Sequence, residues 1–307
     1  MSLDLVIAII VTIAAVATPI LLAALGELVA EKSGVLNLGV EGMMLIGAVI
    51  TVAVTLGTGN HLLAIVCAAL AAAAAMIFGV LTLSLSANQV ATGLALTILG
   101  TGFSALFGQP YTGKSVPTLR SPFPAELAAD PFWRVLFGHP PLVYFALLMV
   151  VAVWWFLGRT RAGLILRAVG ENDLSAHSIG YPVIGVRYLA VAFGGAMAGI
   201  GGACFPLMLT PQWVERLTSG RGWIALALVV FASWRPFRLL GGAYFFGFMM
   251  IFEIYAKSNS AFRFLPSEFW AALPYLATVL VLVLISLRRS GSTSAPACLG
   301  KPFVATA

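Results

Sequence analysis

Long apolar segments recur along almost the whole chain, and they constrain its fold more than any other feature. Nine such segments cover approximately residues 5–25, 38–56, 62–83, 90–107, 142–157, 188–209, 217–234, 240–256 and 270–287. Each is close to the roughly 20 residues that a helix needs to cross a bilayer. Only 9% of the residues are charged, against roughly 25% in soluble proteins. The sequence therefore predicts an all-α, polytopic membrane protein with about nine transmembrane helices, within a range of eight to ten.

Arginines mark the connections that are expected to face the cytoplasm. They follow the fifth segment (Arg159, Arg161, Arg167 and Arg187), the seventh (Arg235 and Arg238) and the ninth (Arg288 and Arg289). Lys and Arg are enriched in cytoplasmic loops, and alternating crossings place all three groups on one side. This predicts a multi-pass membrane protein with its C-terminus in the cytoplasm. The net charge of +6 does not indicate nucleic-acid binding, because the cations form no run interleaved with aromatic residues.

The apolar segments form one predicted membrane domain over residues 1–287. Residues 108–141 are expected to be an external loop with a short amphipathic piece at 126–137, and residues 158–187 are the longest cytoplasmic connection. Segment 217–234 is the weakest, because only 13 residues separate Arg221 from Arg235, so a short or broken helix is expected there. The tail, residues 288–307, has no periodic pattern, and we expect it to be cytoplasmic and disordered.

Polar side chains gather in two stretches within or between apolar segments. The candidates for lining a solute path are Glu27, Asn37, Glu41, Asn88, Gln89 and Thr92. Ionisable groups at membrane depth are costly and are usually kept where they face a water-filled path or pair internally. Glycines at 26, 34, 39 and 42 would let the backbone break in the first stretch. The alternatives are a solvated turn for the first stretch and hydrogen bonds between helices for the second.

The connection at 158–187 contains the pattern of a short capped helix. Asn172 or Asp173 can cap its start, Gly180 can end it, and Pro182 prevents its continuation. A capped, amphipathic helix of about seven residues at the membrane face could dock a cytosolic protein. The alternative is a surface helix without a partner.

Small residues recur every four positions at Gly195, Gly199 and Ala203, a spacing that predicts close packing between membrane helices. No catalytic or metal-binding pattern is found. The three histidines are isolated, the three cysteines lack ligand spacing, and neither H-E-x-x-H nor G-x-S-x-G occurs. Residues 108–115 match G-x-x-x-x-G-K-S, but they follow an apolar segment and not a strand, so a phosphate loop is not predicted. We expect this chain to bind no metal or cofactor.

Four separate stretches, occurring in this order, resemble one family of transport proteins. They are GELVAEKSGVLNLGVEGMMLIGA at 26–48, RAVGENDLSAHSIG at 167–180, VRYLAVAFGGAMAGIGGA at 186–203 and GRGWIALALVVFASWRP at 220–236. The chain resembles, over approximately residues 17–287, the permeases of ATP-binding-cassette (ABC) importers for ribose, other simple sugars, branched-chain amino acids and nucleosides. Within that family it is most similar to the shorter permease of purine nucleoside type systems.

The resemblance implies the permease fold of these importers, a location in the bacterial cytoplasmic (inner) membrane, and a translocator without catalytic residues. Such a permease moves a small polar solute by alternating access, here a nucleoside or simple sugar, with a branched-chain amino acid as the alternative. Its implied partners are a cytosolic ABC ATPase that binds ATP and Mg²⁺, a second homologous permease (as a heterodimer, or alternatively a homodimer), an extracytoplasmic solute-binding protein and the lipid bilayer. The residues matching the ATPase-coupling segment are Arg167, Gly170, Glu171, Asn172, Asp173, Ser175 and Gly180.

Two rivals come from other classes. A stand-alone secondary transporter would sustain uptake from an ion gradient without ATP, and an intramembrane enzyme would show turnover by the single purified chain. The absence of any nucleotide-binding motif in its proper context fits a transport subunit whose motor is a separate protein.

Overall fold

The computed structural model describes residues 3–70, 72–124, 126, 130–258, 265–287 and 295–303. Within these residues the ordered elements are helices, and no strand occurs. In chain order they are α1 (Leu3–Lys32), α2 (Val40–Thr58), α3 (His61–Ala69), α4 (Ala72–Gly79), η1 (Val80–Ser84), α5 (Gln89–Gly108), η2 (Gln109–Tyr111), α6 (Pro131–Phe137), α7 (Pro141–Arg159), α8 (Arg161–Glu171), α9 (Asp173–Ser178), α10 (Val183–Cys204), η3 (Phe205–Leu209), α11 (Arg221–Phe231), α12 (Pro236–Ser258) and α13 (Ser267–Leu287).

Among the described residues, seven helical segments are long and apolar enough to cross a membrane. They are α1, α2, the run from α3 to η1, α5 with η2, α7, α10 with η3, and α12. The two remaining predicted segments also hold helices, α13 with 21 residues and α11 with 11. The predicted all-α, polytopic architecture is confirmed, and the weakest predicted segment contains the short helix expected there.

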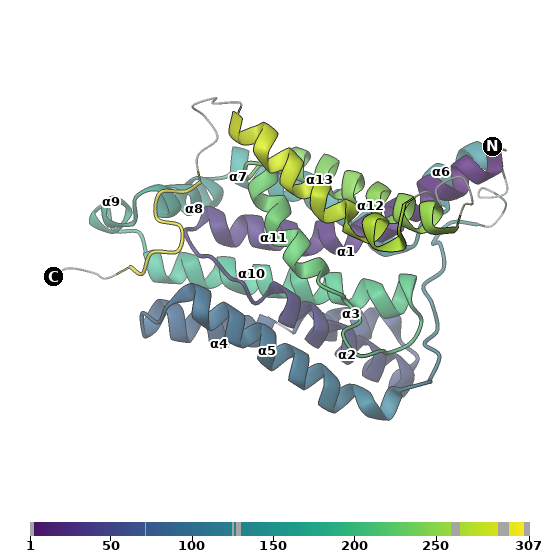
Figure 1. Ribbon diagram of the computed structural model, residues 1–307. Coiled ribbons are helices and arrows are strands. Elements are labelled where there is room, and N and C mark those ends of the chain that lie inside the picture. Colours follow the sequence, from purple (N-terminus) through teal and green to yellow (C-terminus); the bar gives the residue numbers. More distant parts are fainter. Residues whose placement is uncertain are drawn as a thin grey trace.

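The helices α1 and α10 form the centre of the bundle. Figure 1 shows α2, α3, α4 and α5 on one side of this pair and α7, α11, α12 and α13 on the other. The pair packs closely because Gly26 of α1 faces Gly194 of α10, where an added methyl group would lie 2.9 Å from the Gly194 carbonyl oxygen. Gly199 contacts Gly47 of α2 in the same way, and Gly195 and Ala203 are buried. Small residues at such positions let helix backbones approach closely.

The first helix is longer than the predicted segment at 5–25. It continues to Lys32, so Glu27 and Glu31 lie within the helix, and the chain breaks only at residues 33–39. Gly34 permits this turn with φ of +93°. Gly26 and Gly42 do not break the backbone, contrary to the expectation, because both are used for close contacts between helices.

The segment between α10 and α11 turns back into the bundle. Trp213 donates its indole N–H to the Ser104 hydroxyl near the end of α5 (3.3 Å), whereas Gly220 donates its N–H to Glu41 at the start of α2 (2.8 Å). Helix α11 therefore begins inside the bundle. Residues 210–220, which are not helical, form the preceding part of this membrane crossing. Arg216 and Ser219 have φ of 55° and 49° in this segment, an uncommon conformation for residues with a Cβ.

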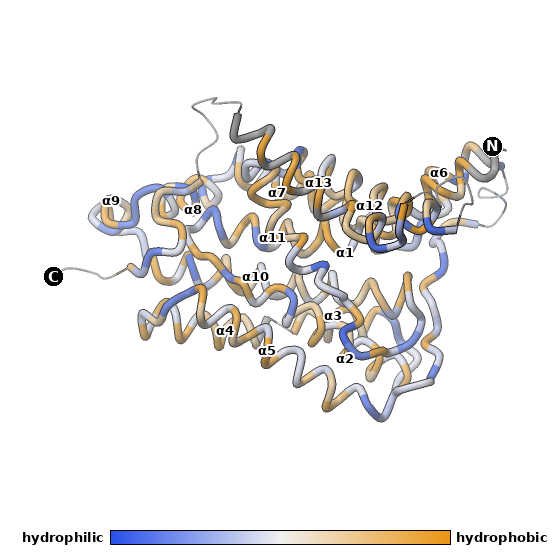
Figure 2. Tube along the Cα trace, in the orientation of Figure 1, coloured by the Kyte–Doolittle hydropathy of each residue, from blue (hydrophilic) through white to orange (hydrophobic). Residues whose placement is uncertain are grey.

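The two ends of the bundle carry different loops, and Figure 2 shows hydrophilic segments mainly at these ends. At one end, the predicted external loop bonds to the segment after α10, through Val116 N to Pro211 O (2.8 Å) and Leu119 N to Leu207 O (2.9 Å). Within the predicted amphipathic piece, α6 starts after Asp130, whose side chain caps it. Residues 125 and 127–129 lie outside the described residues. The other end carries α8, α9 and residues 295–303 (Figure 1), and we call it the α8–α9 end.

Part of the C-terminal tail has a defined position, contrary to the expectation of disorder. Cys298 N donates to Gly170 O at the end of α8 (3.0 Å), and Gly300 N donates to Gly34 O in the turn after α1 (3.1 Å). The Phe303 ring lies edge-on to His177 of α9 at 5.4 Å. Residues 295–303, here called the strap, thus connect three elements because their amides satisfy carbonyl groups at chain turns. Residues 288–294 and 304–307 are outside the described part.

Candidate functional site

The predicted capped helix is present at the α8–α9 end. Asn172 caps α9, its side-chain oxygen accepting a hydrogen bond from Ser175 N (2.9 Å). The helix ends before Gly180, whose φ of +96° favours glycine, and Pro182 follows. The preceding helix α8, capped by Thr160 through Gly163 N (3.0 Å), was not predicted. A Thr followed by a helix-forming run that leads into Asn172 could have indicated it.

One face of α9 is anchored and the other is open. Ala176 is buried in a small cluster with Val169 and Val183, which fixes the helix to α8 and α10. Leu174 and Ile179 point outward, and 55% and 73% of their surface is exposed. A short helix with an anchored face and an exposed apolar face is suited to receive another protein.

Arg187 connects α9 to the turn after α1. Its guanidinium is completely buried and forms an ion pair with Asp173 of α9, with Nη2 3.0 Å from Oδ2. Its Nε donates to Ser33 O (3.1 Å), and its Nη1 lies 3.5 Å from Lys301 O of the strap. Sequence reasoning treated Arg187 only as a topology signal, because its partners lie 14, 154 and 114 positions away.

The other predicted coupling residues surround this connection. Gly170 approaches Lys32 O so closely that a side chain would clash, which brings α8 directly against the end of α1. Glu171 O accepts a weak hydrogen bond from the Cys298 thiol (3.6 Å), and Arg167 lines a cavity beside Lys32. The seven predicted coupling residues therefore lie in α8, in α9, at Asn172 between these two helices, or at Gly180 in the turn that ends α9.

Three of the predicted path residues hold the turn between α1 and α2. Glu27, 1% exposed, accepts Asn37 N on Oε1 (2.9 Å), and Gln89 accepts Leu36 N on Oε1 (2.8 Å). Asn37 in turn accepts Gly39 N (2.9 Å). The structure thus brings Glu27, Asn37 and Gln89 together around residues 33–39. The Gln89 side-chain nitrogen is buried without a hydrogen-bond partner among the described residues, which leaves it available to a polar group.

Glu41 lies where the broken crossing meets α2. Its carboxylate accepts the Gly220 and Gly222 amides (2.8 and 2.6 Å) and the Thr218 hydroxyl (2.5 Å). A carboxylate at a helix start is favoured by the helix dipole and satisfies amides that lack helical partners. Glu41 therefore stabilises the N-terminus of α11 inside the bundle, where water cannot satisfy these groups.

A pocket of about 680 Å³ opens beside this junction, between α2, α5 and the segment before α11. Among its lining residues are Glu41, Thr97, Thr101, Arg216, Ser219 and Trp223. Hydroxyl groups, a guanidinium and an indole ring suit a small solute with polar groups and a flat apolar face. Thr101, Arg216, Ser219 and Trp223 were not predicted. The turn-forming run at 218–222 was the available signal that helix did not begin at Leu217.

The remaining predicted path residues lie near the start of α5. Asn88 caps this helix, accepting Ala91 N on its side chain (3.0 Å), and Thr92 is half-buried in the first turns. Of the six predicted path residues, Glu41 lines the pocket described above. The other five are not among the lining residues of that pocket: Glu27, Asn37 and Gln89 bond to the turn at residues 33–39, and Asn88 and Thr92 lie at the start of α5.

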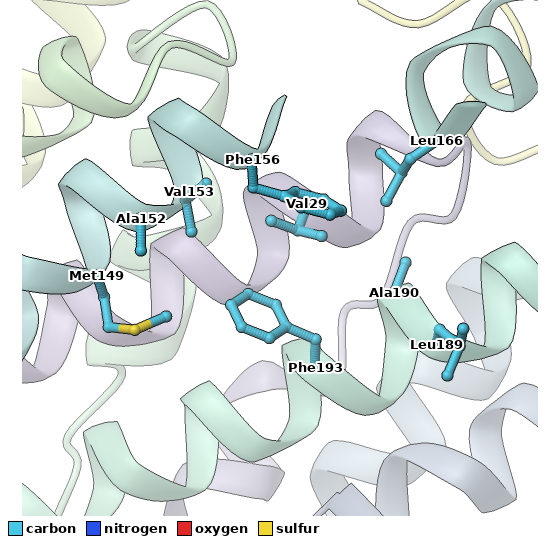
Figure 3. A pocket seen from close by; sticks show the side chains of 9 residues that line it. All are labelled: Val29, Met149, Ala152, Val153, Phe156, Leu166, Leu189, Ala190 and Phe193. Atoms are coloured by element: carbon cyan, nitrogen blue, oxygen red, sulfur yellow. The ribbon is translucent and has the colours of Figure 1, made fainter. Parts of the chain in front are cut away.

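A second pocket, shown in Figure 3, has a different character. Met149, Val153 and Phe156 of α7 face Val29 of α1 and Phe193 of α10 across about 260 Å³. None of the side chains that Figure 3 labels carries nitrogen or oxygen. Because no polar group could orient a polar solute, this pocket is not a candidate for the path.

Known proteins give the broader context for this geometry. The model of a family described as the permease component of the branched-chain amino acid transport system matches residues 9–285. The chain belongs to this permease family. A Haloferax volcanii protein, named for glucose transport as an ABC transporter permease, is 45% identical over 254 residues, covering 80% of this chain and 76% of its own. The guanosine ABC transporter permease of Bacillus subtilis is 31% identical over 94% of this chain and 93% of its own.

A third relative, the nucleoside ABC transporter permease of Lactococcus lactis, is 27% identical over 87% of this chain and 88% of its own. The expected resemblance is thereby confirmed. The protein is a multi-pass membrane permease subunit of an ABC transport system, one that also includes an ATPase and a solute-binding protein, and it is not itself an enzyme.

Proposed function

We propose that this permease imports a nucleoside or a simple sugar across the cytoplasmic membrane, through a path that passes the junction of α2, α5 and α11. The observation that carries the proposal is the broken crossing, whose helix α11 starts inside the bundle beside a polar pocket. Transporters commonly bind solutes where membrane helices are discontinuous. The relatives named for guanosine, nucleoside and glucose transport support this class of solute.

The pocket chemistry agrees with such a solute. The Thr97 and Thr101 hydroxyls donate to Leu38 O and Thr97 O, so their oxygens can accept hydrogen bonds from ribose or sugar hydroxyls. The Trp223 ring offers a face on which a nucleobase or a sugar ring can pack. The Glu41 carboxylate already accepts hydrogen bonds from the Gly220 and Gly222 amides at the start of α11. Its proposed role is therefore to maintain the shape of the pocket and not to bind the solute directly.

The contacts at the α8–α9 end, which we place in the cytoplasm together with the C-terminus, support coupling to a cytosolic ATPase. The ATPase docks on the exposed face of α9, with ATP and Mg²⁺ bound entirely by that partner. Movement of α9 reaches the turn at residues 33–39 through Asp173, Arg187 and Ser33. That turn is bonded to Glu27 and Gln89, so displacement of α9 changes the surroundings of α2 and α5, which form the pocket.

A second, homologous permease completes the path. The pocket is bounded on one side by α5, whose residues Val90, Leu94 and Ile98 remain exposed. Pairing with a non-identical permease would cover this side. A solute-binding protein delivers the solute to the opposite end, where the loops at 108–119 and 207–213 meet.

The proposal is tested by uptake in proteoliposomes that contain the full transport complex and its solute-binding protein. Labelled guanosine, glucose and isoleucine are supplied in separate assays with ATP on the ATPase side. We expect guanosine or glucose to accumulate. Trp223→Ala should reduce the uptake rate about ten-fold, because one good aromatic contact contributes about 1–1.5 kcal/mol. The matched control is Trp133→Ala, an exposed residue of α6 at the bundle's edge. Accumulation of isoleucine alone would contradict the proposed substrate class.

A further inference from the structure

A cavity of about 550 Å³ at the α8–α9 end gathers four positively charged side chains. They are Lys32 at the end of α1, Arg167 of α8, and Arg235 and Arg238 at the start of α12. The proximity of these groups agrees with the prediction that the arginine-rich connections share one side of the membrane. The further basic residues Arg288 and Arg289 lie outside the described residues.

The charges in this cavity are not balanced by neighbouring carboxylates. None of the four cations forms an ion pair with a described residue, and the described lining contains no acidic side chain. Glu171 and, less strongly, Glu31 act on Lys32 without forming an ion pair with it, and Glu31 Oε2 already accepts the Trp234 indole N–H (2.6 Å). Helix α12 begins at this cavity with Pro236, so its dipole adds further positive potential. Such a group of like charges favours a bound anion.

The rim of the cavity carries two exposed aromatic side chains. Trp154 of α7 is 43% exposed and Phe237 of α12 is 51% exposed. Their rings meet edge to face, with the ring centroids 5.6 Å apart. Both lie near the ends of membrane-spanning helices, the position where aromatic side chains meet the headgroup region. A ligand with a phosphate among the cations and an apolar part along this rim satisfies both features of the cavity.

We propose that this cavity binds the phosphate group of an anionic membrane lipid. Basic pockets between membrane helices on the cytoplasmic side are suited to such headgroups. The lipid would sit beside Lys32, directly before the turn at residues 33–39, and its apolar chains would lie over Trp154 and Phe237. The site is distinct from the solute pocket beside Glu41 and does not depend on which solute is carried.

The test uses the purified transport complex in detergent, titrated with dioleoyl phosphatidylglycerol or dioleoyl phosphatidylcholine. Bound lipids are counted by native mass spectrometry. We expect the wild type to retain phosphatidylglycerol in preference to phosphatidylcholine. The double variant Arg235→Gln with Arg238→Gln should weaken phosphatidylglycerol binding about 25-fold, because each charge removed should weaken it about five-fold.

Two matched pairs separate this site from general charge effects. Arg159→Gln with Arg161→Gln removes the same charge from the same end but outside the cavity lining, and binding should stay within about two-fold because exposed charges are screened by salt. Arg235→Lys with Arg238→Lys keeps the charge and should retain most of the binding. This conservative pair also shows that a loss in the glutamine pair does not come from misfolding.

Several results would overturn the proposal. Equal retention of the two lipids by the wild type would do so, as would equal losses in the cavity pair and in its control pair. Displacement of phosphatidylglycerol by excess inorganic phosphate would identify a site for free anions and not for lipid. Release of the lipid when the ATPase joins the permease would show instead that the cavity receives an acidic group of that subunit.

Discussion

At the scale of single residues, two buried charges hold the interior of the permease in place. The Glu41 carboxylate satisfies the start of α11 within the bundle, and the Arg187 guanidinium joins α9 to the turn after α1. Both charges are surrounded by protein, where an unsatisfied partner is costly. Substitutions at these positions therefore give the clearest residue-level tests.

Glu41→Ala should lower the stability of the permease and abolish uptake. The change leaves the Gly220 and Gly222 amides without their acceptor, and each orphaned group costs about 1–3 kcal/mol. Glu41→Gln, which retains one acceptor oxygen, should have a smaller effect. The measurement is thermal unfolding of the purified complex alongside uptake. Glu253→Ala is the control, because Glu253 only pairs with Lys257 four residues away on α12, and a loss there equal to that of Glu41→Ala would contradict this role.

Arg187→Met should uncouple ATP hydrolysis from transport. It removes the ion pair with Asp173 and the hydrogen bond to Ser33 O. Breaking a fully buried ion pair lowers the free energy of unfolding by about 3–5 kcal/mol. The loss here should be smaller, because the Asp173 side chain is 13% exposed. We expect the complex to assemble, with ATPase activity retained and uptake per ATP reduced. Arg187→Lys should recover part of the coupling. Unchanged uptake per ATP in the Met variant would rule out this connection as the route.

The sequence indicated these residues, but it did not predict their hydrogen-bond partners. Glu41 stood out as a carboxylate next to an apolar segment, but its acceptor role depends on Thr218, Gly220 and Gly222, about 180 positions away. Nothing in local pattern reveals that residues 210–220 turn back into the bundle. The Asn172 cap, by contrast, was predicted because capping needs only the next three residues.

At the scale of elements, the α8–α9 end is a small assembly of α8, α9 and the strap. The strap bonds to Gly170 and Gly34, and its Phe303 ring contacts His177 of α9. It therefore ties the helix proposed to receive the ATPase to the turn that shapes the interior. Its role in coupling can be tested by truncation.

Removal of residues 295–307 should reduce uptake while leaving the permease inserted and assembled. The bundle keeps its helices, but α9 loses the contacts that connect it to Gly34 through the strap. The matched control removes only residues 304–307, which leaves the strap complete. Uptake and ATPase activity of both truncated forms are compared in proteoliposomes. Equal uptake by the two forms would show that the strap has no part in coupling.

The exposed face of α9 should be required for assembly with the ATPase. Leu174→Ser with Ile179→Ser removes two apolar side chains that the bundle itself does not cover, so the permease should stay stable while ATPase binding weakens at least ten-fold. Co-purification of the two subunits measures the effect. Leu62→Ser is the control, since this α3 residue has a similar exposure of 72% at the opposite end. Normal co-purification of the double variant would place the ATPase elsewhere.

Predictions at this scale succeeded where a single helix determined the pattern. Apolar length identified the membrane segments, and the small residues at 195, 199 and 203 are buried within the bundle. The strap was missed because its nine residues have no period and gain their structure only from carbonyl groups of Gly34 and Gly170. The extension of α1 to Lys32 was missed because charges at Glu27 and Glu31 resemble the end of a membrane segment.

At the scale of the whole molecule, two interruptions of regular helix meet at the start of α2. The turn at residues 33–39 leads into its first residues, and the broken crossing before α11 ends against Glu41. Through Arg187, the first interruption is connected to α9, and the second borders the polar pocket. The bundle therefore offers a continuous set of contacts from the proposed motor contact to the proposed solute path.

The central claim is that transport is driven by ATP hydrolysis in a partner and not by this chain alone. The most direct measurement is solute uptake in proteoliposomes, with ATP, with ADP, or with an imposed sodium or proton gradient in place of nucleotide. We predict uptake by the full complex with ATP only, and none by the permease alone under any gradient. Gradient-driven uptake by the purified permease without its ATPase would contradict the claim and identify a secondary transporter.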